Sequence, residues 1–555
     1  MGALRESLER RPWLLSLVLA VVFLPIKLYG SECGYLNMHA ARDWERGWQM
    51  WHGVQVWWNG PELLFRGAIP GYFFNLLAGI FQIPTRNPIF ASYGPGLLFC
   101  GGIFFFHDGM RRIFSAATAL WATLLFASQP LGTIALRYLW NPSYLFIFGA
   151  LAFWCIARAL TERRGGWMAG ALVCTLLAAQ LHLSAYSATV AVLIIMVRCR
   201  ILPRWWHWLV VVGIHAAFVG PYFYTQYMDA WPDRAAMRQN QLELQSNLAR
   251  ILPNPTFLPP FGLQIFVQYP GYPRTFPFSY YERFYEARRA FRYLGFMGFV
   301  LTVPFILAMI AGLVASLKRR TPDEPTGDAR RLYIQCAGIY LAVCCIPQIL
   351  WNPSAKVGLY ANDANFGVPI RYLLILWPSQ FILMAGWLEK VFAGRLAGMT
   401  RLWLGAAVGT CVLITLAFNW QARKTGEPFS YLHLHDRPVH AVRDKFALAR
   451  HLVDRWGVDD ATLQSRVHTA GFMMTGAEES MDYELRAAEE MNPGHPKADP
   501  GIFYFLSGSA ELGRVKGDAE ILEQKSFGSI GLTVYRPRQD LSRWQVDAPL
   551  SWWWY

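Results

Sequence analysis

Two carboxylates near the start of the chain have the types and spacing for acid–base or metal chemistry. Asp43 and Glu45 are separated by one residue, flanked by Arg42 and Arg46, and follow an apolar run at 13–30. A carboxylate held among aromatic side chains just above a bilayer is partly desolvated, which moves its pKa up towards the range of a general base. The alternative is that both carboxylates form ion pairs with their neighbouring arginines on a short interfacial helix.

Basic side chains also lie on the outer side of the membrane, where the distribution of charge in membrane proteins predicts few. They are Arg66, the group Arg274, Arg283, Arg288, Arg289 and Arg292 near the end of the 227–292 loop, Lys356 and Arg371. The planar guanidinium fork matches phosphate oxygens, so we expect at least one of these residues to bind phosphate, and Arg371 is the strongest candidate. Contacts with lipid headgroups are the alternative.

His182 lies at the outer end of an apolar run and is followed by Ser184 and Tyr186. An ionisable side chain inside a membrane segment is a candidate functional residue by default. A structural hydrogen bond to a neighbouring helix is the alternative.

The composition indicates that membrane segments must position these residues. Of the 555 residues, 54% are hydrophobic and only 16% are charged, against about 25% charged in soluble domains. The net charge of +14 resides mostly in short loops between apolar runs, which is typical of membrane topology rather than of nucleic-acid binding. No cysteine follows Cys411 and no metal-type cysteine spacing occurs, so the end of the chain has no disulfide framework.

Apolar runs predict about eleven membrane helices, each near the roughly 20 residues that a span needs. They cover 13–30, 88–106, 115–132, 141–160, 167–182, 184–199, 205–226, 293–316, 332–350, 369–389 and 401–419. If the further run at 70–84 is an interfacial helix, all arginine-rich loops fall on the cytoplasmic side. The amino terminus is then cytoplasmic and the carboxyl terminus is extracytoplasmic.

Two parts follow from this topology. Residues 1–420 form an all-α polytopic membrane module with outer loops at 31–87, 227–292 and 351–368. Residues 421–555 form a small extracytoplasmic α+β domain, which begins with an amphipathic helix at about 438–456 and ends with strand-like runs such as 531–535.

Several short motifs occur in an order that resembles the GT-C fold glycosyltransferases, in particular the protein O-mannosyltransferase superfamily and its lipid A aminoarabinose transferases. An acidic residue soon after the first span precedes Pro70-Gly71-Tyr72, which opens the interfacial helix. The later motifs are Arg137-Tyr138-Leu139-Trp140-Asn141-Pro142, Gln180-Leu181-His182-Leu183-Ser184-Ala185 and Arg371-Tyr372-Leu373-Leu374. The resemblance covers roughly residues 10–420.

The resemblance implies a bacterial glycosyltransferase of the cytoplasmic (inner) membrane. Such an enzyme moves a sugar from a polyprenyl-phosphate donor to an extracytoplasmic acceptor, which is a glycolipid, a polymer or a protein of the cell envelope. The acidic residue of the first outer loop is the general base and the anomeric centre inverts. Asp43 matches that position better than Glu45. The expected substrate-binding residues are Arg66, Arg137, Asn141, His182, Arg288, Arg289, Lys356, Arg371 and Tyr372.

Asn141 departs from the family, which often has an Asp-Pro at this point. An amide cannot act as a base and is a poor ligand for a divalent metal, so we expect no metal and no other cofactor. Two other functions remain open. A lipid transporter or flippase would place charges at the midplane of two matching halves, and the chain has no matching halves. A non-catalytic membrane assembly subunit is favoured only by Asn141.

Overall fold

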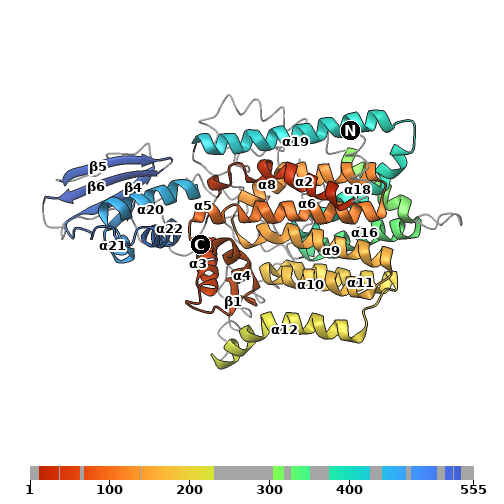
Figure 1. Ribbon diagram of the computed structural model, residues 1–555, viewed down its shortest axis with the longest axis horizontal. Coiled ribbons are helices and arrows are strands. Elements are labelled where there is room, and N and C mark those ends of the chain that lie inside the picture. Colours follow the sequence, from red (N-terminus) through yellow and green to blue (C-terminus); the bar gives the residue numbers. More distant parts are fainter. Residues whose placement is uncertain are drawn as a thin grey trace.

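The computed structural model describes residues 12–34, 36, 38–62, 68–137, 139–229, 304–317, 327–350, 374–425, 441–469, 477–508, 519–528 and 530–538. Most of these residues lie in helices that pack side by side in a bundle (Figure 1). The bundle helices are α2 (Pro12–Leu28), α6 (Gly94–Ile113), α7 (Ala116–Ser128), α8 (Pro130–Arg137), α9 (Leu145–Glu162), α10 (Gly165–Leu181), α11 (Tyr186–Cys199), α12 (Trp205–Met228), Pro304–Leu317, α16 (Gly327–Leu350), α18 (Trp377–Phe392) and α19 (Ala397–Thr425).

Aromatic rings and glycines fill the core of the bundle. The Phe99 ring stacks on Phe126 with centroids 5.3 Å apart and meets the Phe146 ring edge to face at 5.0 Å. Gly149 of α9 packs against the Ile375 carbonyl, and a Cβ there would lie 3.3 Å from Pro378 at the start of α18. Small residues allow apolar helices to approach closely, as in membrane bundles.

The described helices include four that are long and apolar enough to cross a membrane: Pro88–Ile113, Asn141–Glu162, Trp205–Met228 and Ala397–Lys424. Shorter apolar helices are Trp13–Leu28, Phe73–Gln82, Ala116–Ser128, Gly165–Leu181, Leu183–Cys199 and Pro304–Leu317. Helices at the edge of the bundle turn apolar side chains outward, such as Leu209 at 62% and Leu402 at 77% exposure. Such a surface suits lipid rather than water, so the chain is a membrane protein.

The helix ends rich in arginine meet at one end of the bundle, away from the strands β3–β6 (Figure 1). Arg112, in the last turn of α6, lies 2.9 Å from Asp108 and 3.9 Å from Glu162, at the end of α9. Glu389 of α18 contacts Arg330 of α16 at 3.2 Å and accepts a hydrogen bond from Ser115 Oγ at 2.8 Å. Ion pairs therefore connect the loops that the sequence assigns to the cytoplasmic side.

Short elements cover the opposite end of the bundle. They are η1 (Ser31–Cys33), α3 (Met38–Trp51), the paired strands β1 (Asn59–Glu62) and β2 (Ala68–Pro70), α4 (Phe73–Gly79), η2 (Ile80–Gln82), α5 (Pro88–Ala91), η3 (Asn141–Tyr144), η4 (Leu183–Ala185) and η8 (Leu374–Leu376). Asn87 caps α5 by accepting from Ile89 N, with Pro88 at the first helical position. Helix α4 with η2 is shorter than a membrane span.

Residues after 441 form a separate layer of helices and strands. Helices α20 (Val442–Trp456), α21 (Asp460–Arg466) and α22 (Ala477–Met491) pack with a four-stranded sheet of order β3-β4-β6-β5. The strands are β3 (Val467–Thr469), β4 (Phe503–Gly508), β5 (Ala519–Phe527) and β6 (Ile530–Pro537). Strands β3 and β4 are parallel, and the other pairs are antiparallel, with Leu506 of β4 opposite Leu532 of β6. These two leucines lie in the core of this layer.

The mostly helical fold that the sequence predicts is confirmed, and the number of spans remains a prediction. The division at residue 420 is likewise a prediction. The outer loops at 227–292 and 351–368 lie almost wholly outside the described residues, as do parts of the predicted spans 293–316 and 369–389.

A buried ion pair joins α20 to α22 within the carboxy-terminal layer, and two hydrogen bonds connect this layer to the segment before α3. Lys445 Nζ lies 3.2 Å from Glu484 Oε1, and both side chains are almost fully buried. The same ammonium donates to the Leu36 carbonyl at 2.7 Å, and Val442 N donates to the Gly34 carbonyl at 3.0 Å. Burial raises the pKa of Glu484 and lowers that of Lys445, and each charge partly offsets the effect on the other.

We expect Lys445→Met to destabilise the carboxy-terminal layer by about 3–5 kcal/mol, because it leaves a carboxyl buried without its cation. The double variant Lys445→Met/Glu484→Leu recovers most of this loss. The raised pKa of Glu484 means that the folded state holds this proton more tightly than the unfolded state. Stability therefore falls as pH rises above the unfolded pKa of 4.5, and the single variant is weaker at pH 8 than at pH 5.

Pulse proteolysis of the full chain in nanodiscs measures this. Exposed Lys497 is the control, and Lys497→Met should change the free energy of unfolding by no more than about 0.5 kcal/mol. Equal effects at positions 445 and 497 would contradict the ion-pair account.

Candidate active site

Helix α3 carries both acidic residues of the first outer loop, but it sends them in different directions. Successive residues of a helix are rotated by about 100°, so Asp43 and Glu45 project to nearly opposite sides. Asp43 shares a side with Gly47 and Trp51, which follow it at intervals of four residues. The acid-x-acid pair therefore does not converge on one ion. Within the described ranges, no group of three His, Cys, Asp or Glu side chains is placed to hold a metal.

Asp43 is completely buried, at 0% exposure. Its Oδ1 accepts a forked pair of hydrogen bonds from Arg42, with Nη2 at 2.9 Å and Nε at 3.1 Å. The ion pair with Arg42 that the sequence raised as an alternative is therefore present, but the full burial of the carboxylate is more than a surface pair requires. Only about a quarter of the Arg42 side chain is exposed, so the pair is well shielded from solvent.

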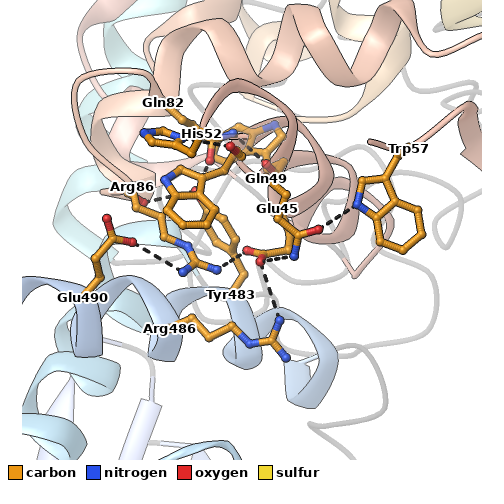
Figure 2. A network of polar contacts seen from close by, with 11 residues as sticks. Glu45, Gln49, His52, Trp57, Gln82, Arg86, Tyr483, Arg486 and Glu490 are labelled. Atoms are coloured by element: carbon orange, nitrogen blue, oxygen red, sulfur yellow. Dashed lines mark hydrogen bonds and ion pairs between the residues drawn. The ribbon is translucent and has the colours of Figure 1, made fainter. Parts of the chain in front are cut away.

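Glu45 lies in a polar network that reaches the carboxy-terminal layer (Figure 2). Its two oxygens contact Arg86, from the loop before α5, and Arg486 of α22, the latter at 3.6 Å. Gln49 also donates to Glu45 Oε1 at 2.8 Å. The Asp43 and Glu45 carboxylates therefore have different surroundings on the two sides of one helix.

Glycines allow α3 to cross α4 at very short distance. A Cβ built on Gly47 would lie 2.6 Å from Gly79 N and would also collide with the Asn75 carbonyl. Trp51, on the same side of α3, donates from Nε1 to the Leu76 carbonyl at 2.8 Å. These contacts fix the position of α3 along α4 and its rotation about its own axis.

The Pro70-Gly71-Tyr72 turn places the beginning of α4 against the bundle. Gly71 has φ +102°, and a Cβ there would lie 2.8 Å from Gln180 Cδ at the end of α10. Both the conformation and the close approach require glycine. Tyr72 then packs edge to face on Trp58, with centroids 5.3 Å apart, and tilted against Phe218 of α12, also at 5.3 Å.

Asn141 and His182 come together at the outer ends of α9 and α10. Asn141 Nδ2 donates to the Leu181 carbonyl, immediately before His182. His182 Nδ1 accepts from Ser184 N at 3.2 Å, so Nδ1 is the unprotonated nitrogen in this arrangement, and Ser184 Oγ lies 2.8 Å away. This bond is local and caps η4, and it is not the bond to a neighbouring helix that the sequence raised as an alternative.

Buried amide groups gather around this point. Asn141 Oδ1, both polar atoms of Gln180 and Asn75 Oδ1 are buried and have no hydrogen-bond partner in the part of the chain that the structure describes. Gln180 is part of a motif in the sequence, but nothing in the sequence showed that its amide would face the Gly71 turn.

Arg137 joins three elements below α3. Its guanidinium donates to the Tyr29 carbonyl at 2.6 Å, to Ser31 Oγ at 2.7 Å and to Asn419 Oδ1 at 3.3 Å. Burial lowers the pKa of Arg137 to about 10, and nearby Glu32 opposes the shift, so the side chain stays charged at neutral pH. Arg137, which the sequence predicted to bind substrate, therefore donates its hydrogen bonds to neutral groups of η1, α19 and the end of α2.

Lys27 is a buried lysine that was not among the site residues predicted from the sequence. Its Nζ donates to Thr133 Oγ1 of α8 at 2.8 Å and lies 4.7 Å from the centre of the Phe99 ring. A lysine inside the first apolar run was the available signal. Arg86 and Tyr483 were also missed, because their partners in α3 are far away in the sequence.

The other predicted site residues lie outside the described residues. These are Arg66, Arg288, Arg289, Lys356, Arg371 and Tyr372. Their roles stay predictions.

We expect Gly71→Ala to destabilise the protein more than Gly53→Ala. Both glycines have positive φ, so each change costs about 1–2 kcal/mol of backbone strain. Gly53 faces open space, whereas a Cβ at Gly71 meets Gln180, which adds about 1–3 kcal/mol of overpacking. Thermal unfolding in nanodiscs compares the two, and equal shifts in Tm would show that the Gln180 contact is not tight.

Two solved structures of ArnT from Cupriavidus metallidurans are similar to this chain. The apo structure is 12% identical, with 94% of this chain and 97% of ArnT covered and a TM-score of 0.50. The structure bound to undecaprenyl phosphate is 10% identical over the same shares, with a TM-score of 0.49. No protein-family model and no curated protein matches the sequence. At this identity the apo match shows the fold alone, and the chain has the GT-C fold of ArnT that the sequence resemblance implied.

Proposed function

We propose that this chain is a membrane glycosyltransferase that moves a sugar from a polyprenyl-phosphate donor to an acceptor outside the cytoplasm, with Asp43 as general base. The GT-C fold supports the class of reaction. The sugar, the acceptor and the length of the carrier lipid are left open by the residues described above.

The observation that carries this proposal is the placement of Asp43. Its carboxylate is fully buried on an outer helix, at the end of the bundle opposite the arginine-rich loops. The Gly47–Gly79 crossing fixes the helix, and Arg42 orients the carboxylate. A base needs this combination of a defined direction and a restricted water supply.

The proposed reaction is a direct displacement. Asp43 takes the proton from an acceptor hydroxyl as the oxygen forms a bond to the anomeric carbon of the sugar. The bond from that carbon to the phosphate oxygen breaks, and polyprenyl phosphate leaves with the electron pair. One displacement inverts the anomeric centre. Arginines of the outer loops, Arg371 foremost, are expected to hold the leaving phosphate.

The proposal also gives the membrane orientation. Arginine-rich loops at one end of the bundle are cytoplasmic by the positive-inside rule. Helix α3 and the carboxy-terminal layer at the other end then face the periplasm of a bacterial inner membrane. Undecaprenyl phosphate, the lipid bound in one ArnT structure, is the carrier to test first.

We expect Asp43→Asn to lower sugar transfer by about 10²–10⁴-fold, the usual contribution of a general base. The protein in nanodiscs would be incubated with a panel of radiolabelled undecaprenyl-phosphate sugars, and sugar release and transfer would be measured. Asp108→Asn is the matched control. Asp108 accepts from Trp154 at 2.7 Å and lies 2.9 Å from Arg112 at the arginine-rich end of the bundle, so this change should leave the rate within about 3-fold.

Equal loss in both variants would indicate a general effect on folding and would remove Asp43 from the role of base. Full activity of Asp43→Asn would do the same. Failure of the wild-type protein to release sugar from any donor of the panel would contradict the glycosyltransferase assignment itself.

A further inference from the structure

Helix α3 is held on its Glu45 side by Arg86 and by residues of α22, a helix from the far end of the chain. Arg86 contacts Glu45 with one nitrogen and lies 3.5 Å from Glu490 of α22 with the other. Arg486, one turn earlier on α22, lies 3.6 Å from Glu45. Figure 2 shows these groups converging between α3 and α22. Two arginines and two glutamates thus connect the first outer loop to the carboxy-terminal layer.

Aromatic packing reinforces the ion pairs. The Arg86 guanidinium lies over the Trp48 ring at 4.2 Å. The Tyr483 ring of α22 meets Trp44 edge to face, with centroids 6.1 Å apart. A stacked guanidinium and an edge-to-face pair each contribute roughly 0.5–2 kcal/mol. Helix α22 therefore contacts Trp44 directly, and Arg86, its ion-pair partner, covers Trp48.

A hydrogen-bond relay runs from α22 to the backbone beside Asp43. Tyr483 Oη donates to Gln82 Oε1 at 2.6 Å, and Gln82 Nε2 donates to the Trp44 carbonyl at 3.0 Å. Tyr483 and Gln82 are both buried. Burial raises the pKa of Tyr483 well above its usual value, so the phenol remains a donor at any physiological pH. The peptide group between Trp44 and Glu45 is therefore held through one amide side chain by a tyrosine of the carboxy-terminal layer.

We infer that α22 is a positioning element for the active site: its Tyr483, together with Arg86 from the loop before α5, holds α3 so that the Asp43 carboxylate points at the acceptor. The inference rests on the proposed function. Displacements of about 1 Å remote from the chemistry can cost about 100-fold in rate. Glu45 then fixes the position of α3, the helix that carries the base, through its ion pairs. The carboxy-terminal layer is therefore a part of the catalytic unit.

The test separates kcat from KM for the full-length protein in nanodiscs with an undecaprenyl-phosphate sugar. Tyr483→Phe deletes one oxygen and keeps the ring against Trp44, and Arg86→Gln deletes the charge. We expect each to lower kcat about 10- to 100-fold, with donor KM within about 3-fold and Tm well above the assay temperature. Arg86→Lys should recover part of kcat, because it restores the charge next to Glu45.

The matched control is Arg536→Gln. It breaks an exposed ion pair with Asp499, 3.1 Å away, in the same carboxy-terminal layer and should leave kcat unchanged. A double-mutant cycle adds Glu45→Gln to Arg86→Gln. If both residues act through one anchor, the double variant is no slower than the slower single variant.

Wild-type kcat in Tyr483→Phe and Arg86→Gln, with Asp43→Asn inactive, would overturn the positioning role and leave the proposed function standing. Parallel losses of kcat, donor affinity and Tm would show that Tyr483 and Arg86 act only on the stability of the protein, and would also overturn the positioning role. Full activity of Asp43→Asn would instead remove the base on which the inference rests.

Discussion

The end of the bundle that carries the candidate base depends on the close crossing of α3 over α4. Gly47 approaches Gly79 and the Asn75 carbonyl so closely that no side chain fits at position 47. The crossing sets the rotation of α3, and the rotation decides that Asp43 turns into the buried side while Glu45 turns to the carboxy-terminal layer. Helix α4 is itself placed by the Gly71 turn against Gln180. The position of the candidate base is therefore set by the close approach of Gly47 to α4 and of Gly71 to Gln180.

The different surroundings of Asp43 and Glu45 follow from helix geometry. A pair separated by one residue would present both groups to one side of a strand, and could then share a proton or a metal. On α3 the same spacing separates them. Asp43 accepts a hydrogen bond from Arg42 in a buried position, whereas Glu45 contacts Arg86 and Arg486. One helix can therefore hold a reactive group on one side and its mechanical support on the other.

Much of this could be predicted from the sequence, where the signals are local. Apolar runs predicted the bundle helices, and Pro70-Gly71-Tyr72 predicted a short helix that the structure places as α4. The proximity of Asn141 and His182 follows from their positions at the outer ends of neighbouring helices. The ion pairs around Glu45 could not be predicted, because no periodicity connects Glu45 to Arg86, 41 positions later, or Arg86 to Glu490, a further 404 positions later. The position of the Gln180 amide, which has no hydrogen-bond partner within the described residues, depends on tertiary packing alone.

The account as a whole claims that Asp43 activates an acceptor for a single displacement at the anomeric carbon. The most direct measurement is the anomeric configuration of the transferred sugar, determined by proton NMR on the product and compared with that of the donor. A single inverted anomer is the result that the account predicts. Retention of configuration would require a covalent intermediate or a second displacement, and it would contradict the role of Asp43 as the base.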